Sequence, residues 1–260
     1  MTQAGTDMVG KALRLLAALG EHPDGARLSD LARRCGYPVS TTHRLLASLL
    51  REGFADYDPR TRTYGLGLRV FGLSASVSHA RGFAGSALPP LSRLSGHTGE
   101  ATLMSVRDGD HQLYVHHVEG RGQVQVIGEP GRLGPLHCTS MGKCLVAFAP
   151  DGERKRLCDE LPLDALGPRT ITDRAAFAAE IRLVRERGHA FADEEHEEGI
   201  RAAGVPVLAP DGTAIAAISV AAPAYRMPME RLASFVPELR KTAEELAVVL
   251  PPRPVRPPLR

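Results

Sequence analysis

A row of small hydroxyl residues followed by two basic residues marks the start of a helical segment at residues 38–50, "PVSTTHRLLASLL". Short hydroxyl side chains let a helix approach a nucleic acid closely, and they can bond to phosphates or to base edges. An arginine in the same turn can form paired hydrogen bonds with guanine or a charge-assisted bond with a phosphate. We therefore predict that this turn contacts DNA through five residues, Ser40, Thr41, Thr42, His43 and Arg44.

A winged helix-turn-helix would position this row. Apolar residues recur at helical spacing in residues 7–21, and a second helical stretch begins at Ser29, its expected N-cap, and stops at Gly36. The third helix opens near Ser40, whose hydroxyl is also expected to cap it. Residues 53–67 then alternate apolar and polar side chains around "DPRT", which predicts a β-hairpin. The second helix of such a motif presents its first turn to the major groove.

Four further arginines extend the predicted DNA-binding surface. Arg60 and Arg62 lie at the predicted hairpin tip, where a wing meets the DNA backbone or the minor groove. Arg33 and Arg34 precede the turn, and we predict that they contact phosphates rather than bases.

Charge divides the chain into two modules. Residues 1–81 hold 11 Lys and Arg against 7 Asp and Glu, whereas residues 82–250 hold 18 against 23. The 260 residues are 43% hydrophobic and 24% charged, which is ordinary for a globular protein. The longest apolar runs are too short to span a bilayer, and the first 22 residues lack the pattern of a signal peptide. We expect a cytoplasmic protein with no membrane partner.

The four cysteines do not form a C-x-x-C pair. Cys138 and Cys144 stand six residues apart with His137 before the first, which is an irregular spacing for a metal site. We predict buried free thiols and no metal ligands. The sequence contains neither a Walker A motif nor a G-x-G-x-x-G motif, so we predict no cofactor.

The pattern becomes mixed α/β from about residue 84, after a helical connector rich in small residues. Hairpins are predicted around "RDGD" and "PDGT", and "QVQVIGE" (residues 123–129) is predicted as a strand. Four helices are predicted: from Pro90 to Gly96, from Thr139 or Ser140 to Pro150, from Thr172 or Asp173 to Gly188, and over residues 229–250. This order predicts an α+β domain with one central antiparallel sheet. The Pro- and Arg-rich residues 251–260 are expected to be a disordered tail.

The helix start in "CTSMGK" (residues 138–143) suits an anion, because free N–H groups and the helix dipole favour negative charge there. Lys143, one turn further on, is expected to add positive charge. The residues of this turn that we expect at the site are Thr139, Ser140 and Met141. We expect apolar walls from three strand residues, Val205, Val207 and Ile218. The acidic run at residues 193–198 abuts an apolar strand, so one or two of its members are expected to face the ligand.

In this order and spacing, six segments resemble the IclR family of bacterial transcriptional regulators: "LSDLARRCGYPVSTTHRLLASLLREGF", "YGLGLRVFGL", "GPLHCTSMGKCLVAF", "TITD", "ERGHAFADEEHEEGIRAAGVPV" and "GTAIAAISVAAP". The resemblance covers nearly the whole chain. It implies a winged helix-turn-helix joined by a helix to a GAF-like effector-binding domain. It also implies a homodimer or homotetramer that binds double-stranded DNA at a palindromic operator and responds to a small organic or aromatic acid.

The resemblance also implies where the effector binds. The family's pocket corresponds to Thr139, Ser140, Met141, Lys143, Asp193, Glu195, Ala202 and Ser219. Ala202 stands where many members have a cysteine, which implies a roomier or less polar pocket wall. The expected boundaries are residues 1–67 for the DNA-binding domain, 68–83 for the linker helix, 84–250 for the effector-binding domain and 251–260 for the tail.

Two classes of function remain open at this stage. The first is a regulator of a metabolic, catabolic operon that carries out no catalysis. The second is a cysteine-based redox sensor or a catalytic GAF-like domain, since Cys138 stands close to a helix N-terminus that lowers a thiol pKa. No set of nucleophile, base and orienting residue can be assembled from the sequence. Alkylation of the thiols distinguishes the classes, because a regulator of the first class keeps its DNA binding and ligand response.

Overall fold

The computed structural model describes residues 8–80, 85–124 and 126–250. Within these ranges the chain forms two compact units, divided between His79 and Ala80. The expected tail over residues 251–260 lies outside the described residues. Within the described ranges, every helix is too short or too polar to cross a membrane.

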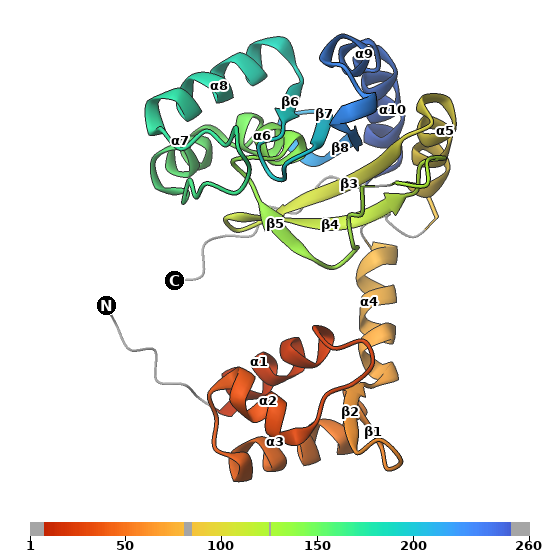
Figure 1. Cartoon of the computed structure of the whole chain (residues 1–260), viewed down its shortest axis with the longest axis vertical. Coiled ribbons are helices and arrows are strands. Elements are labelled where there is room, and N and C mark those ends of the chain that lie inside the picture. Colours follow the sequence, from red (N-terminus) through yellow and green to blue (C-terminus); the bar gives the residue numbers. More distant parts are fainter. Residues whose placement is uncertain (1–7, 81–84, 125, 251–260) are drawn as a thin grey trace. The chain divides into compact units, whose positions relative to one another are not determined.

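The first unit is a three-helix bundle followed by a two-stranded hairpin, as the sequence predicts (Figure 1). Its elements are α1 (Met8–Gly20), α2 (Leu28–Cys35), α3 (Val39–Arg51), β1 (Ala55–Asp58) and β2 (Thr63–Leu66). One face of each helix is apolar, and these faces enclose a common core. The core includes Leu15, Leu19, Leu31, Leu45, Leu46 and Ala55.

The turn between α2 and α3 is fixed by the backbone. Gly36 ends α2 in the left-handed region with φ 68°, as predicted, and its N–H bonds to the end of the helix. Both predicted serine caps are wrong. Arg27 occupies the N-cap position of α2, and α3 begins after Pro38. Ser40 therefore lies inside the first turn of α3 and does not cap it.

One helix lies on each side of the division between the units in the sequence. The predicted ends of the second helix are wrong. The first is α4 (Leu68–Ala80), which carries exposed apolar side chains. The second, α5, spans Leu88–Thr98 rather than Pro90 to Gly96. Its prolines stand in the first turn, where a missing N–H costs no hydrogen bond. Gly96 lies inside the helix, and Gly99, with φ 77°, is the left-handed stop.

A six-stranded antiparallel sheet forms the centre of the second unit, with the order β5-β4-β3-β8-β7-β6. Its strands are β3 (Ala101–Asp108), β4 (His111–Val118), β5 (Leu133–Pro135), β6 (Ala190–Asp193), β7 (Ile200–Leu208) and β8 (Ala214–Pro223). The hairpins predicted at "RDGD" and "PDGT" join β3 to β4 and β7 to β8. The strand predicted over "QVQVIGE" is wrong, because its described residues, 123, 124 and 126–129, form no strand.

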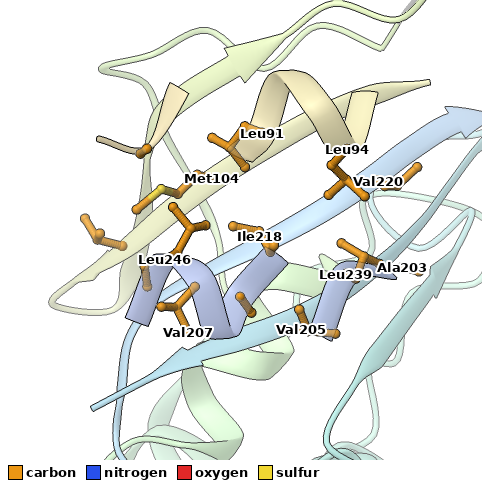
Figure 2. Close-up of a cluster of buried hydrophobic side chains, with 14 of the residues drawn as sticks. Leu91, Leu94, Met104, Ala203, Val205, Val207, Ile218, Val220, Leu239 and Leu246 are labelled. Carbon is orange, nitrogen blue, oxygen red and sulfur yellow. The ribbon is translucent and has the colours of Figure 1, made fainter. Parts of the chain in front are cut away.

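Helices cover both faces of this sheet. On one face, α5 and α10 (Val236–Val249) enclose the cluster in Figure 2, and α9 (Met229–Ser234) adds Leu232 to the same core. The single helix predicted over residues 229–250 is therefore broken into two. On the other face lie α6 (Ser140–Ala147), α7 (Asp151–Glu160) and α8 (Arg174–Arg187). Asp173 caps α8 through its side chain and Gly188 ends it, as predicted.

Side-chain alternation assigns each strand residue to one of these two layers. Figure 2 shows Val205, Val207 and Ile218 directed toward α5 and α10. The sequence places these three residues in the wall of a ligand site at α6, and that prediction is wrong. Their neighbours of opposite parity, such as Ala202 and Ser219, face the α6 layer instead.

Candidate functional site

The solvent-facing side of α3 carries most of the predicted DNA contacts. Ser40, His43 and Arg44 are exposed, and Thr41 is half-buried. Among the described residues, the side chains of His43 and Arg44 have no ion pair or hydrogen bond, so both can bind an external partner. This face can offer two hydroxyls, an imidazole and a guanidinium to a groove.

Thr42 departs from the prediction. Its side chain is fully buried, and its hydroxyl donates to the carbonyl of Pro38 at 3.1 Å. Residues three and four positions further along a helix share a face, so Thr42 points inward with Leu45 and Leu46. Thr42 therefore supports the position of α3 and is not exposed on the face that carries Ser40, His43 and Arg44.

The hairpin tip presents two exposed arginines, as predicted. Arg62 adopts a left-handed conformation with φ 58°, and its N–H donates to the carbonyl of Asp58 at 2.8 Å. The N–H of Arg60 donates to the Asp58 carboxylate at 2.8 Å. The turn is therefore held by the backbone and the carboxylate of Asp58. The Arg60 side chain is 88% exposed, and its Nε lies 3.8 Å from the same carboxylate.

The two arginines of α2 already have partners within the unit. Arg33 pairs with Asp30 on the same helix at 2.9 Å. Arg34 forms a bidentate pair with Glu21 at 2.8 and 3.0 Å, which ties α2 to the end of α1. Both remain exposed, but a phosphate must compete with a carboxylate for each of them.

The second unit contains a pocket at the start of α6, and it encloses about 570 Å³ of empty space including its open mouth. Five predicted site residues meet there: Thr139, Ser140, Met141, Ala202 and Ser219. The other lining residues are Leu103, Tyr114, Val126, Ile127, Ala192, His196, Glu197, Ile200 and Ala221.

A glycine allows the start of α6 to approach the sheet. Gly204 of β7 pairs with Ser219 of β8, and its missing side chain faces the first turn of α6. A Cβ at this position would lie 2.9 Å from the carbonyl carbon of Ser140 and 3.0 Å from its Oγ. Gly204 therefore places the hydroxyls of Ser140 and Ser219 on the same side of the sheet.

Some hydroxyl groups in the pocket form hydrogen bonds within the protein, and others do not. The hydroxyl of Thr139 caps α6 by accepting from Gly142 N at 3.0 Å, and it also accepts from Gln112 at 2.8 Å. By contrast, Ser140 and Ser219 are 2% and 1% exposed, and their hydroxyls bond to none of the described residues. Their hydroxyls, together with the first N–H groups of α6, are available to a ligand.

Tyr114 supplies a further donor to the pocket. Its oxygen accepts a hydrogen bond from Gln112 at 3.2 Å. Burial raises the pKa of Tyr114 to about 12, so the phenol keeps its proton at neutral pH. That proton can be donated to a ligand oxygen.

Lys143 does not line the pocket, contrary to the prediction. It is 1% exposed, and its Nζ lies 2.7 Å from Glu195 Oε1 and 3.4 Å from Glu180 Oε1. Glu180 also pairs with Arg187 at 2.8 Å. The charge of Lys143 is neutralised inside this network, because a buried ammonium requires a counter-ion.

The two acidic residues predicted to face the ligand are also held elsewhere. Glu195 is buried against Lys143, and burial raises the pKa of its carboxyl while Lys143 opposes that rise. Asp193 pairs with Arg201 at 2.5 Å and with Arg169. The acidic run instead contributes His196 and Glu197 to the pocket.

Sequence reasoning missed several lining residues. Leu103 and Tyr114 face the pocket because they alternate with core residues on β3 and β4, a signal present in both strands. Val126 and Ile127 line it from a segment that was expected to be a strand. No local signal selects His196 from its neighbours, because it follows the end of β6.

Cys138 and Cys144 do not support redox chemistry. Cys138 and Cys144 are fully buried, and burial raises the pKa of each thiol to about 12. A thiol with such a pKa carries almost no thiolate at neutral pH, and the thiolate is the reactive form. Across the described ranges, no group of three or more His, Cys, Asp or Glu side chains is placed to hold a metal ion.

Comparison with known proteins identifies both units. Residues 8–59 match the IclR helix-turn-helix domain, and residues 75–248 match the C-terminal domain of bacterial IclR transcriptional regulators. The "Probable transcriptional regulator SauR" of Cupriavidus necator is 34% identical over 236 residues, which cover 91% of this chain and 94% of that protein.

Solved structures agree over the same length. An IclR transcriptional regulator from Alicyclobacillus acidocaldarius is 28% identical with a TM-score of 0.82, covering 93% of this chain and 98% of that one. An IclR homologue from Microbacterium hydrocarbonoxydans, complexed with 4-hydroxybenzoate, shares the fold at 24% identity with a TM-score of 0.82. The match covers 94% of this chain and 99% of that one. The chain belongs to the IclR family of bacterial transcriptional regulators.

Proposed function

We propose that this regulator binds a palindromic operator through its first unit and changes that binding when a small carboxylic or aromatic acid enters the pocket at α6. The observation that carries the proposal is the pair of buried, unbonded hydroxyls of Ser140 and Ser219 in that pocket. A hydroxyl that lines a pocket and bonds to no other group of the protein is free to form a hydrogen bond with a ligand. The protein carries out no catalysis and works in the cytoplasm, where its operator lies.

The DNA contacts divide between α3 and the flanking arginines. Ser40, Thr41, His43 and Arg44 enter the major groove, with Arg44 reading a base edge. Arg33, Arg34, Arg60 and Arg62 bind the sugar–phosphate backbone or the minor groove. We assign residues 1–67 to DNA binding, 68–83 to the linker helix and 84–250 to effector binding.

A second copy of the chain completes the DNA-binding surface. One winged helix-turn-helix makes few contacts, so operator binding requires two copies on half-sites spaced about 34–36 Å, or a multiple, apart. The first unit offers exposed apolar residues for such a contact: Val9 is 67% exposed, Leu68 83% and Phe71 73%. We propose that α1 and α4 pair with the same helices of a second copy, to give a dimer or a dimer of dimers.

The effector binds with its acidic group at the start of α6. The first N–H groups of α6 and the hydroxyls of Ser140, Ser219 and Tyr114 receive the carboxylate. Leu103 and Ile200 supply apolar contacts for the remainder of the molecule. The regulated genes belong to a metabolic, catabolic operon that consumes such an acid.

Calorimetry with a panel of small carboxylates, including benzoate and 4-hydroxybenzoate, tests this site. Ser140→Ala removes one hydrogen bond to a charged group, so we expect affinity for the bound acid to fall about tenfold. Ser92→Ala is the control, because Ser92 is exposed on α5 and far from the pocket lining. Binding that survives both Ser140→Ala and Ser219→Ala unchanged would place the effector elsewhere.

A further inference from the structure

One wall of the pocket comes from the loop between β4 and β5, which we call the wall loop (described residues 119–124 and 126–132). Val126 and Ile127 of this loop line the pocket, and Ile127 is 74% exposed. Residues 126–128 form no hydrogen bond with any other described residue. The position of this wall is therefore set by the parts of the loop that precede and follow it.

The part that follows the wall is attached to β4 by backbone hydrogen bonds. The Gly131 N–H donates to the carbonyl of Tyr114 at 2.7 Å, and the Tyr114 N–H donates to the carbonyl of Arg132 at 3.0 Å. Gly128 lies between this attachment and the wall residues. A Cβ at Gly128 would overlap the side chain of Leu103 and would lie 3.4 Å from Tyr114 Cδ1. The wall loop therefore lies directly against two other residues that line the pocket.

The part that precedes the wall is held by a side chain from a distant part of the sequence. Arg226 follows β8 in the short 3-10 helix η1 (Ala224–Arg226), and its Nη2 donates to the carbonyl of Val124 at 3.0 Å. A Cβ at Gly122 would lie 2.7 Å from this Nη2, so a glycine is needed for the loop to approach the guanidinium this closely. The hydrogen bond is only two residues away from Val126 in the chain.

A buried carboxylate holds Arg226 in turn. Its Nε lies 3.0 Å from Glu100 Oε1, and its Nη2 lies 2.7 Å from Glu100 Oε2. Glu100 is 6% exposed and stands directly before β3, and the Arg226 side chain is 25% exposed. A bidentate pair fixes the orientation of the guanidinium as well as its distance. The central sheet therefore determines where the Val124 carbonyl is held.

The segment that contains Arg226 also holds a second loop of the pocket wall, between β6 and β7. The Ala224 N–H donates to the carbonyl of Gly199 in that loop at 2.7 Å. Arg201, at the start of β7, donates through Nη1 to the carbonyl of Met227 at 3.0 Å. Two loops that line the pocket are therefore attached to the segment that follows β8.

We propose that Arg226 is a positioning residue of the effector site, which holds the wall loop in contact with a bound carboxylic acid. This inference rests on the proposed function, and it adds the residue that keeps the ligand in place. A ligand at the start of α6 covers part of the exposed Ile127 side chain, which is favourable because that side chain is apolar. The anchor at Val124 maintains this contact. Loss of the anchor lets the ligand escape faster and leaves the start of α6 unchanged.

Arg226→Lys and Gly122→Ala test this anchor in the full-length protein. Lysine keeps one positive charge for the buried carboxylate, but its ammonium lacks the planar fork that bonds to the carboxylate and to Val124 at once. Gly122→Ala keeps Arg226 and places a methyl group against its Nη2, which pushes the loop and the guanidinium apart. Arg93→Lys is the control, because Arg93 forms an exposed ion pair and does not line the pocket.

The panel of small carboxylates supplies the probes. Calorimetry measures the Kd, and ligand-observed NMR relaxation measures the dissociation rate. We expect Arg226→Lys and Gly122→Ala each to raise the Kd about threefold to tenfold, the loss of one hydrogen bond, mainly through faster dissociation. Arg93→Lys should change neither value. A fall in Tm with an unchanged dissociation rate in both variants would make the role of Arg226 purely structural and would overturn the inference.

A double-mutant cycle tests whether Arg226 acts through the wall loop. Ile127→Ala removes the wall contact itself. Arg226→Lys should then have little further effect on the dissociation rate, because the contact that the anchor maintains is already lost. Effects of Arg226→Lys and Ile127→Ala that simply multiply would contradict the inference.

The proposed function can fail separately. If Ser140→Ala weakens binding while Arg226→Lys and Gly122→Ala do not, the carboxylate site stands and the anchor is wrong. If Arg226→Lys weakens binding while Ser140→Ala and Ser219→Ala do not, the anchor stands and the carboxylate site is wrong. If no carboxylate of the panel binds to the wild type, both are wrong.

Discussion

Replacement of Lys143 by methionine tests the buried ion network behind the pocket. Methionine keeps much of the side-chain volume but removes the ammonium that lies 2.7 Å from Glu195. Glu180 keeps Arg187 as a partner, whereas Glu195 is left buried without one. Removing one partner of a buried pair costs about 3–5 kcal/mol. For a unit of this size, that corresponds to a fall in Tm of about 6–20 °C.

The loss should depend on pH. Burial already raises the pKa of Glu195 and Lys143 opposes this, so the variant's carboxyl has a still higher pKa. A carboxyl whose folded-state pKa is raised binds its proton more tightly in the folded state. The contribution of Glu195 to the free energy of unfolding is therefore fully present below the pKa of a glutamate in the unfolded chain, about 4.3. It is lost as the pH rises through the pKa of Glu195 in the folded protein. Lys143→Met should be less destabilised at pH 5 than at pH 8.

Urea unfolding followed by circular dichroism measures this effect, since the chain contains no Trp for fluorescence. Adding Glu195→Gln should recover part of the loss, because a neutral amide is cheaper to bury than an unpaired carboxylate. Lys155→Met is the control. Its ammonium is 83% exposed and 3.8 Å from Asp159, so we expect a change within about 0.5 kcal/mol. A loss below about 1 kcal/mol for Lys143→Met, or no recovery with Glu195→Gln, would refute the role given to the network.

Three further predictions concern the two sites. Arg44→Ala should weaken operator binding by about 1–3 kcal/mol with little effect on random DNA, as measured by fluorescence anisotropy; an equal loss on both would make Arg44 a phosphate contact. Gly204→Ala should displace the start of α6 and weaken carboxylate binding in calorimetry, whereas Gly152→Ala, which has open space around it, should not. Cys138 and Cys144 should resist alkylation in the folded protein, and rapid labelling with loss of DNA binding would revive the redox alternative.

Local sequence patterns were sufficient to predict the helix-turn-helix, because helix stops and the apolar faces of helices depend on residues only a few positions apart. The left-handed Gly36 was predictable for this reason. The burial of Thr42 was also within reach, since it shares a helical face with Leu45 and Leu46. A continuous row of hydroxyl residues nevertheless suggests a single exposed surface, and this hides the inward position of Thr42.

The lining of the pocket could not be predicted in full, because it depends on contacts between residues far apart in the sequence. Lys143 meets Glu195 from 52 positions away, so its burial could not be read from the helix start alone. The sequence shows that side chains alternate between the two faces of the sheet along β7 and β8. It does not show on which face α6 packs, and that decides which of the alternating residues face the ligand. Val205 was therefore assigned to the wrong face, and Ala202 to the right one through the family resemblance.

We propose that an acid bound at the start of α6 changes the affinity of α3 for the operator. Operator DNA selected by the protein from genomic fragments should be titrated with and without a saturating carboxylate chosen by calorimetry. We predict that the acid shifts the operator Kd about 5- to 150-fold, and that Ser140→Ala raises the acid concentration needed without changing the limiting shift. An operator Kd that is the same with and without bound acid would contradict the account, as would an unchanged acid requirement in Ser140→Ala.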